Sequence, residues 1–276
     1  MTTFEPIIGG GHPFDQSIAL AAEGEHRWLG RTSPAYANMV GPFGGTLAAQ
    51  ALNGVLLHSE RLGEPVAFTV NFAAPMADGE FVVMARPART NRSTQHWLVE
   101  LRQGNQTVLT ASAVTALRRE TWSADDLALP AAPRPQDTPR SSQPPRVEWA
   151  RRYEMRFVDG SVPDEWKGRD APARTLLWLR DDPPRPLDFA SLTAVADAFF
   201  PRIFLRRGKF VPIGTVSMTT YFLADAAQLA QVADGYLLGD VAAAAYRNGY
   251  FDQTAHLWSE PGVLLASSHQ VVYYKE

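Results

Sequence analysis

The sequence contains the same order of predicted elements twice, one helix followed by four strands. In the N-terminal half the helix is expected within residues 41–60, where glycines precede good helix formers with apolar residues at helical spacing. Segments rich in β-branched and aromatic residues follow, separated by Gly, Asp and Asn turn residues. The four predicted strands span residues 65–75, 79–90, 94–104 and 106–120. This order predicts a helix followed by an antiparallel meander.

The C-terminal half repeats the plan, with a helix predicted over residues 187–200. Its strands are expected at residues 211–225, 235–246, 250–260 and 262–274, and two further strand-like stretches, 151–160 and 173–182, precede the helix. Short stretches of letters recur as well: VLTAS at 108–112 reappears as VLLAS at 263–267. NFAAP at 71–75 aligns with YFLAD at 221–225. Their common order and nearly constant offset favour an internal duplication.

A proline-rich segment separates the two halves. The prolines at 130, 133, 135, 139, 144 and 145 each remove a backbone donor and fix φ, which disfavours a helix interior or central strand. We therefore expect an N-terminal domain at 1–120, a linker at 121–146 and a C-terminal domain at 147–276.

Composition excludes several classes of function. The net charge is −3, without a long basic run, so nucleic acid is not an expected partner. The chain has no cysteine, which removes disulfides, thiolate metal sites and a cysteine nucleophile. His58, His96, His256 and His269 lack metal-ligand spacing, and no serine lies in a Gly-x-Ser-x-Gly context. With no signal-like N-terminus and no apolar stretch of membrane length, we expect a soluble cytoplasmic protein without membrane insertion.

The repeated unit cannot bury all of its surfaces alone. A curved antiparallel sheet wrapped around a helix covers the helix but leaves a sheet edge open to pair with another copy. The duplication supplies that copy within one chain. The sequence therefore predicts an α+β pseudo-dimer with one sheet continuing across the seam.

Several motifs resemble those of the double-hotdog acyl-CoA thioesterases of the acyl-CoA thioesterase II type. In the first half they are Gly41-Pro42-Phe43-Gly44-Gly45 at the helix start, Gln50, and Asn71 to Pro75. In the second half they are Ala196-Asp197, Gly214-Thr215-Val216, and the run from Trp258 to Gln270. The resemblance covers about residues 24–118 and 148–275. It implies two tandem hotdog domains, an acyl-CoA substrate in fatty acid metabolism, no cofactor, and a homodimer or homotetramer.

The resemblance also implies a catalytic trio, which in this chain reads Asp197, Thr215 and Gln270. A carboxylate can accept a proton from water, while a hydroxyl and a carboxamide can orient that water without carrying charge. Backbone N–H groups of Phe43, Gly44 and Gly45 are candidates for binding the developing oxyanion. The chain departs from the family at Thr46 and at Ser217 to Thr220, which leaves the trio intact but affects the pocket.

Each of these residues also has an ordinary structural interpretation. Asp197 would be a polar residue near a helix end, Thr215 a strand former in a strand, and Gly44-Gly45 a turn that starts a helix. Gln270 is more informative, because a buried glutamine within a strand must find hydrogen-bond partners. Two other functions stay open: an acyl-CoA or lipid-binding hotdog without catalysis, and a hydratase or dehydratase. The latter would need a histidine acting with Asp197, and none follows it on the predicted helix.

Overall fold

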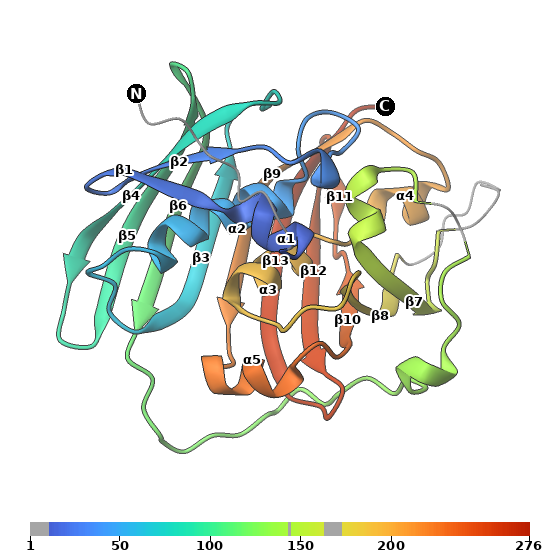
Figure 1. Cartoon of the computed structure of the whole chain (residues 1–276). Coiled ribbons are helices and arrows are strands. Elements are labelled where there is room, and N and C mark those ends of the chain that lie inside the picture. The colour runs from blue at the N-terminus through green and yellow to red at the C-terminus, as the bar shows by residue number, and fades with distance from the viewer. Residues whose placement is uncertain (1–10, 143–144, 163–172) are drawn as a thin grey trace.

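One antiparallel sheet runs through both halves of the chain (Figure 1). A computed structural model describes residues 11–142, 145–162 and 173–276, so the first ten residues, where we expect no signal sequence, lie outside the described part. The strand order is β1-β2-β4-β5-β6-β3-β9-β13-β12-β10-β8-β7, and the short β11 pairs with β12. The predicted sheet that continues across the seam is confirmed.

The strands of the two halves occupy opposite ends of this order. The first half supplies β1 (Leu20–Gly24), β2 (Arg27–Arg31), β3 (Glu64–Phe72), β4 (Glu80–Thr90), β5 (Thr94–Gln103) and β6 (Gln106–Ala116). The second half supplies β7 (Tyr153–Asp159), β8 (Thr175–Asp181), β9 (Ile213–Phe222), β10 (Leu237–Ala242), β11 (Tyr246–Arg247), β12 (Tyr250–Ser259) and β13 (Leu264–Tyr274). Each strand predicted from the sequence corresponds to one of them.

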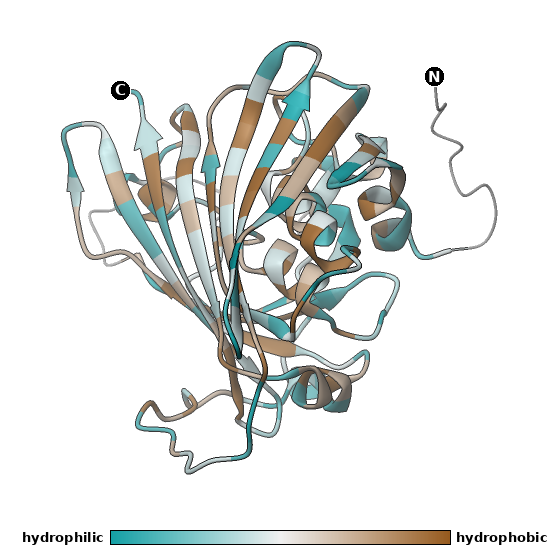
Figure 2. Cartoon of the chain, turned by 90° about the vertical axis from the view of Figure 1, so that its left-hand side faces the viewer, coloured by the Kyte–Doolittle hydropathy of each residue, from teal (hydrophilic) through white to brown (hydrophobic). Residues whose placement is uncertain are grey.

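Helices cover one side of the sheet near its centre, and others lie towards its ends (Figures 1 and 2). They are α1 (Pro13–Ile18), α2 (Gly44–Leu56), α3 (Phe189–Val195), α4 (Arg202–Arg207) and α5 (Ala226–Val232), with 3-10 turns η1 (Pro34–Tyr36), η2 (Pro135–Asp137) and η3 (Glu148–Arg152). No helix in the described residues has both the length and the apolar character needed to cross a bilayer.

The seam between the halves is the pairing of β3 with β9, where Val70 lies opposite Met218. Beside this pair, the hydroxyl oxygens of Thr69 and Thr219 are 3.0 Å apart. The guanidinium of Arg118, at the start of the segment joining the halves, donates to carbonyls on both sides of the seam: Pro65 at 3.0 Å and Phe222 at 2.8 Å. Main-chain pairing and this arginine therefore hold the two halves in one register.

Helix α2 is almost completely enclosed, as its apolar composition predicts. Ala48, Ala51, Leu52 and Val55 are fully buried, on more than one face of the helix. A side chain at Gly54 would come within 2.7 Å of Val83 on β4, so the glycine allows the helix to approach the sheet closely. The helix therefore lies between the sheet and α3.

The second helix is shorter than predicted, and this corrects the expected position of Asp197. Instead of residues 187–200, the α-helix spans Phe189–Val195. The Asp197 N–H donates to the Ala194 carbonyl at 3.1 Å and the Ala198 N–H to the Val195 carbonyl at 2.9 Å, so the last turn tightens to i→i+3 bonds. Pro201 then disfavours helical geometry at the residue before it. Asp197 therefore lies in the turn after the helix and not on its flank.

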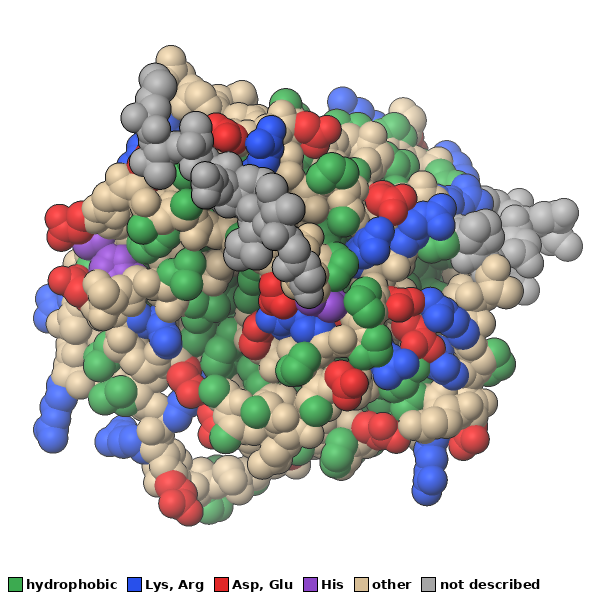
Figure 3. Space-filling view, viewed as in Figure 1, with side chains coloured by type: hydrophobic (Ala, Val, Ile, Leu, Met, Phe, Trp, Pro, Cys, Tyr) green, Lys and Arg blue, Asp and Glu red, His purple; other side chains and the backbone are tan. Residues whose placement is uncertain are grey.

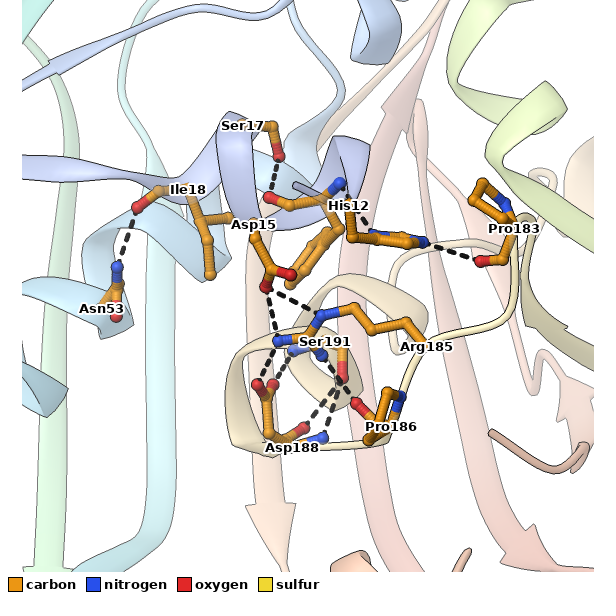
Figure 4. Close-up of polar contacts among 11 residues, drawn as sticks. His12, Asp15, Ser17, Ile18, Asn53, Pro183, Arg185, Pro186, Asp188 and Ser191 are labelled. Carbon is orange, nitrogen blue, oxygen red and sulfur yellow. Dashed lines mark hydrogen bonds and ion pairs between the residues drawn. The ribbon is translucent and has the colours of Figure 1, made fainter. Parts of the chain in front are cut away.

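The sequence did not predict α1 or the β1–β2 hairpin, because both are short and interrupted by charged residues. Figure 4 shows how α1 is attached to the second half. Arg185 donates to Asp15 of α1 at 2.9 Å and also to Asp188, which caps α3. The His12 ring lies 2.7 Å from the Pro183 carbonyl. These contacts fasten α1 across the α2 and α3 layer.

Replacing Arg185 with Ala should lower the free energy of unfolding by about 1–3 kcal/mol, because two charge-assisted hydrogen bonds are lost at a largely buried guanidinium. Urea denaturation followed by circular dichroism measures this. The matched control is Arg27→Ala, whose exposed pair with Glu23 lies within one hairpin and should be worth at most about 1 kcal/mol. Equal losses in both variants would contradict the role given to Arg185.

Candidate functional site

Two of the three predicted catalytic side chains are in direct contact. The Gln270 Nε2 donates to Asp197 Oδ1 at 3.0 Å and lies 3.4 Å from the Ala196 carbonyl. Ser268, two residues earlier on β13, donates to the same carbonyl at 3.4 Å. The last strand therefore holds the turn that carries Asp197 at two points.

The N-terminus of α2 forms the other wall around this carboxyl group. A side chain at Gly44 would come within 2.8 Å of Asp197 Oδ2. One at Gly45 would come within 2.6 Å of the Ala194 carbonyl oxygen, so α2 and the end of α3 approach each other too closely for any other residue. The first half thus contributes backbone, and the second half contributes the carboxyl group.

The environment of Asp197 changes its acidity. Burial raises the pKa of Asp197 to about 7, while hydrogen bonds from Gln270 and from the Gly45 N–H act in the lowering direction. The residue as a whole keeps partial access to solvent. A carboxyl group that changes charge near neutral pH has the property expected of a general base.

Thr215 lies on the same side of the sheet, although it makes no hydrogen bond to Asp197 or Gln270. Gln270 is opposite Met218, but Val272 is opposite Thr215, so Val216 is an extra residue in β9. Since Val272 is buried two residues beyond Gln270 on the same face, the bulge turns Thr215 towards that face. The sequence does not reveal this bulge, because Val216 has ordinary strand character.

The three candidate oxyanion donors differ in their contacts. The Phe43 N–H donates to the Tyr36 carbonyl at 2.8 Å, which removes it as a donor for substrate, and its ring stacks on Trp149 at 4.2 Å. The Gly45 N–H interacts with Asp197. The Gly44 N–H has no acceptor in the described part of the chain, as expected for the first residue of a helix. Gly44 is therefore the remaining candidate.

Sequence reasoning assigned no role to two apolar side chains beside the carboxyl group. The Phe72 ring lies 3.4 Å from where a Gly44 side chain would begin, and Phe72 is only partly buried. The Met218 sulfur is 3.6 Å from Gln270 Nε2. Phe72 is the second residue of the motif at 71–75. The sequence showed this motif only as a similarity to the family and did not indicate that Phe72 lies beside the carboxyl group.

A second buried carboxyl group lies behind the site. Burial raises the pKa of Asp181 on β8 to about 7, against the lowering effect of Arg185. Burial also raises the pKa of Tyr153, which faces Asp181 across β7 and β8 and lies within the electrostatic reach of Asp197. Among the described residues, no group of three side chains is placed to hold a metal ion.

Comparison with known families gives a match over both halves. The family described as acyl-CoA thioesterase N-terminal domain matches residues 33–116, and that described as acyl-CoA thioesterase C-terminal domain matches residues 124–274. The chain belongs to the acyl-CoA thioesterase family. No curated protein sequence matches this thioesterase-family chain.

Solved structures place the family member in the double-hotdog fold. A conserved protein of unknown function with hot dog fold from Alicyclobacillus acidocaldarius is 44% identical, with a TM-score of 0.92 over 97% of this chain and 99% of its own. The tesB protein of Mycobacterium avium subs paratuberculosis is 18% identical, with a TM-score of 0.78 over 95% and 98% of the two chains. The acyl-CoA thioesterase II TesB2 of Mycobacterium marinum is 18% identical, with a TM-score of 0.75 over 95% and 98%. The predicted fold and family are confirmed.

Substituting the two glycines at the start of α2 should have different effects. Gly45→Ala places a methyl group against the backbone carbonyl of Ala194 and should destabilise the protein by about 1–3 kcal/mol. Gly44→Ala meets the movable Asp197 carboxyl group and should cost less. Thermal or urea unfolding of the two variants measures the difference. Equal stability of both with the wild type would contradict the close approach of α2 and α3.

Proposed function

We propose that this protein hydrolyses an acyl-CoA to a free acid and CoA by direct attack of water, with Asp197 as the general base. The observation that carries the proposal is the Asp197 carboxyl group, raised to a pKa of about 7 and held by Gln270 at 3.0 Å. Membership of the acyl-CoA thioesterase family supports the choice of a thioester substrate.

Each polar group has a distinct part in the proposed reaction. Asp197 takes a proton from water as the water oxygen attacks the thioester carbonyl carbon. The Gln270 Nε2 donates to Asp197. The Gln270 Oε1 accepts no hydrogen bond from the described residues and is left to accept one from the water. The Thr215 hydroxyl makes the second contact to that water. The tetrahedral intermediate then collapses, the C–S bond breaks, and Asp197 returns the proton to the leaving sulfur.

The start of α2 stabilises the charge that develops on the carbonyl oxygen. The Gly44 N–H is directed out of the helix end, and the helix of 13 residues places its positive dipole end there. Because Asp197 loses its negative charge when it takes the proton, the oxyanion and the carboxylate do not repel each other at this step. The proposal needs no cofactor.

Binding of acyl-CoA without hydrolysis is the second candidate function. The observation that favours it is the position of Thr215, which has no hydrogen bond to Asp197 or Gln270. Saturable binding with no thiol release across acyl-CoAs from short to long would support this alternative. A cytoplasmic location, a role in fatty acid metabolism and assembly into a homodimer or homotetramer stay predictions from the sequence.

The rate of thiol release should depend on ionisation of Asp197. We expect kcat/KM to rise with pH through a pKa of about 7, because only the carboxylate accepts a proton from water.

Asp197→Asn should lower kcat by about 10²–10⁴-fold, measured with a thiol reagent on purified protein. The control is Asp78→Asn, an exposed carboxylate in a turn, which should keep full activity. Unchanged turnover in Asp197→Asn would refute the assignment.

Phe72 should restrict the acyl group near the thioester carbon. Its ring edge and Asp197 Oδ2 both lie within 3.5 Å of the position of a Gly44 side chain, so little room remains between them. We expect Phe72→Ala to raise kcat/KM for acyl groups branched at the α-carbon relative to unbranched ones of equal length. The comparison is made within the variant, so a general loss of activity cancels. An unchanged ratio would contradict this role.

A further inference from the structure

Two histidines meet at the opposite end of α2 from the candidate site. His26 lies in the turn between β1 and β2, and His58 lies two residues after the end of α2. Nδ1 of His26 is 2.5 Å from Nε2 of His58. The ring centroids are 4.8 Å apart and the planes differ by 16°. The centroid distance equals the N···N distance plus the distance from centroid to nitrogen in each ring. The two centroids and the two nitrogens therefore lie on one line, and the rings meet edge to edge. The geometry is therefore that of an in-plane N–H···N hydrogen bond.

The surrounding structure holds both rings in place. His26 adopts a φ of 59°, which is uncommon for a residue other than glycine, and its carbonyl accepts from the Ala85 N–H at 3.0 Å. His58 is buried against the Trp28 and Trp97 rings, at centroid distances of 5.7 Å and 4.9 Å. The contact thus joins the β1–β2 hairpin to the end of α2 at the expense of an unfavourable backbone conformation.

Hydrogen bonding at the outer nitrogens fixes where the protons lie. The Glu60 N–H donates to His58 Nδ1 at 3.1 Å, so that nitrogen carries no proton in the neutral ring. The proton of His58 is then on Nε2 and is donated to His26 Nδ1. His26 in turn carries its proton on Nε2, which lies 3.6 Å from the Glu25 carboxylate. The neutral pair therefore has one proton arrangement that keeps both hydrogen bonds.

We infer that the His26–His58 pair is a proton-sensitive latch that fastens the β1–β2 hairpin to the end of α2 and loses one of its two hydrogen bonds when one proton is added. A proton on His58 turns Nδ1 into a donor that opposes the Glu60 N–H. A proton on His26 Nδ1 faces the proton on His58 Nε2, which breaks the bond between the two rings. If His58 instead moves its proton to Nδ1, that bond is kept but the hydrogen bond from the Glu60 N–H is lost. Every singly protonated arrangement therefore breaks one of the two hydrogen bonds.

The charges and the access around the pair agree with this inference. Burial and the neighbouring His26 lower the pKa of His58, against opposing effects of Glu60 and Glu25, the carboxylates that face the pair. From β5, the Trp97 ring contacts His58. A surface cavity of about 220 Å³ opens onto both rings, and Figure 3 shows histidine side chains flanked by acidic ones at this edge of the molecule. Because the folded state binds the proton less readily than the unfolded chain, stability falls as the pH falls through the ordinary histidine range.

Hydrogen exchange of the full-length protein at pH 7.5 and pH 5.5, corrected for intrinsic rates, tests the latch. In the wild type we expect residues 57–63, which include the Glu60 N–H, to lose protection roughly fivefold at pH 5.5, as one broken hydrogen bond predicts. His58→Gln, which removes the titrating ring that accepts from the Glu60 N–H, should give the same protection of these residues at both pH values. His96→Asn, exposed on β5, should behave as the wild type. Equal wild-type protection at the two pH values would overturn the inference.

A second measurement on the wild type does not depend on any variant folding. Long-range ¹H–¹⁵N spectra of the imidazole rings at pH 7.5 report which nitrogen carries the proton. The latch requires His58 to be protonated on Nε2 alone, and a proton on His58 Nδ1 would overturn it. Neither experiment involves acyl-CoA, so its outcome is separate from that of the proposed hydrolysis.

Discussion

The close approach of the start of α2 to the end of α3 is the constraint on which the candidate site depends. Two glycines make it possible, since a side chain at Gly45 would meet the Ala194 carbonyl at 2.6 Å. This contact brings backbone N–H groups of the first half to a carboxyl group of the second half. Neither half alone contains both parts, so the site exists because the duplicated units share one sheet.

The same contact accounts for the acidity of Asp197. Withdrawal from water favours the neutral acid, while Gln270 and the Gly45 N–H favour the carboxylate. The balance places the pKa at about 7, where the group can accept and return a proton at little cost. An aspartate at the exposed end of a helix would remain ionised and would be a weaker base.

The sequence predicted the strands well because their β-branched runs and turn residues are local signals, and the duplication identified the seam. It failed where local patterns compete with tertiary contacts. The apolar run at 187–200 continues past Val195, but the chain tightens there and turns into Pro201, so Asp197 leaves the helix. The β1–β2 hairpin was missed because its strands are short, and its attachment depends on His26 and His58, which are 32 residues apart.

Within the site, resemblance identified Asp197 and Gln270, and the residues alone would have supported only Gln270. Thr215 could not be oriented from the sequence, because a bulge at Val216 sets the direction of its side chain. The sequence suggested the Phe43 N–H as a donor to the oxyanion, but in the fold this N–H donates to the Tyr36 carbonyl. Such contacts depend on how distant segments pack, which no local pattern encodes.

The central claim is that burial and hydrogen bonds within the protein set the ionisation of Asp197. Titration of its carboxyl carbon by ¹³C NMR, in the wild type and in Gln270→Ala, measures this directly. The account predicts a pKa near 7 in the wild type and a higher value in the variant, which loses a hydrogen bond that favours the carboxylate. An ordinary aspartate pKa of about 4 in the wild type would contradict it.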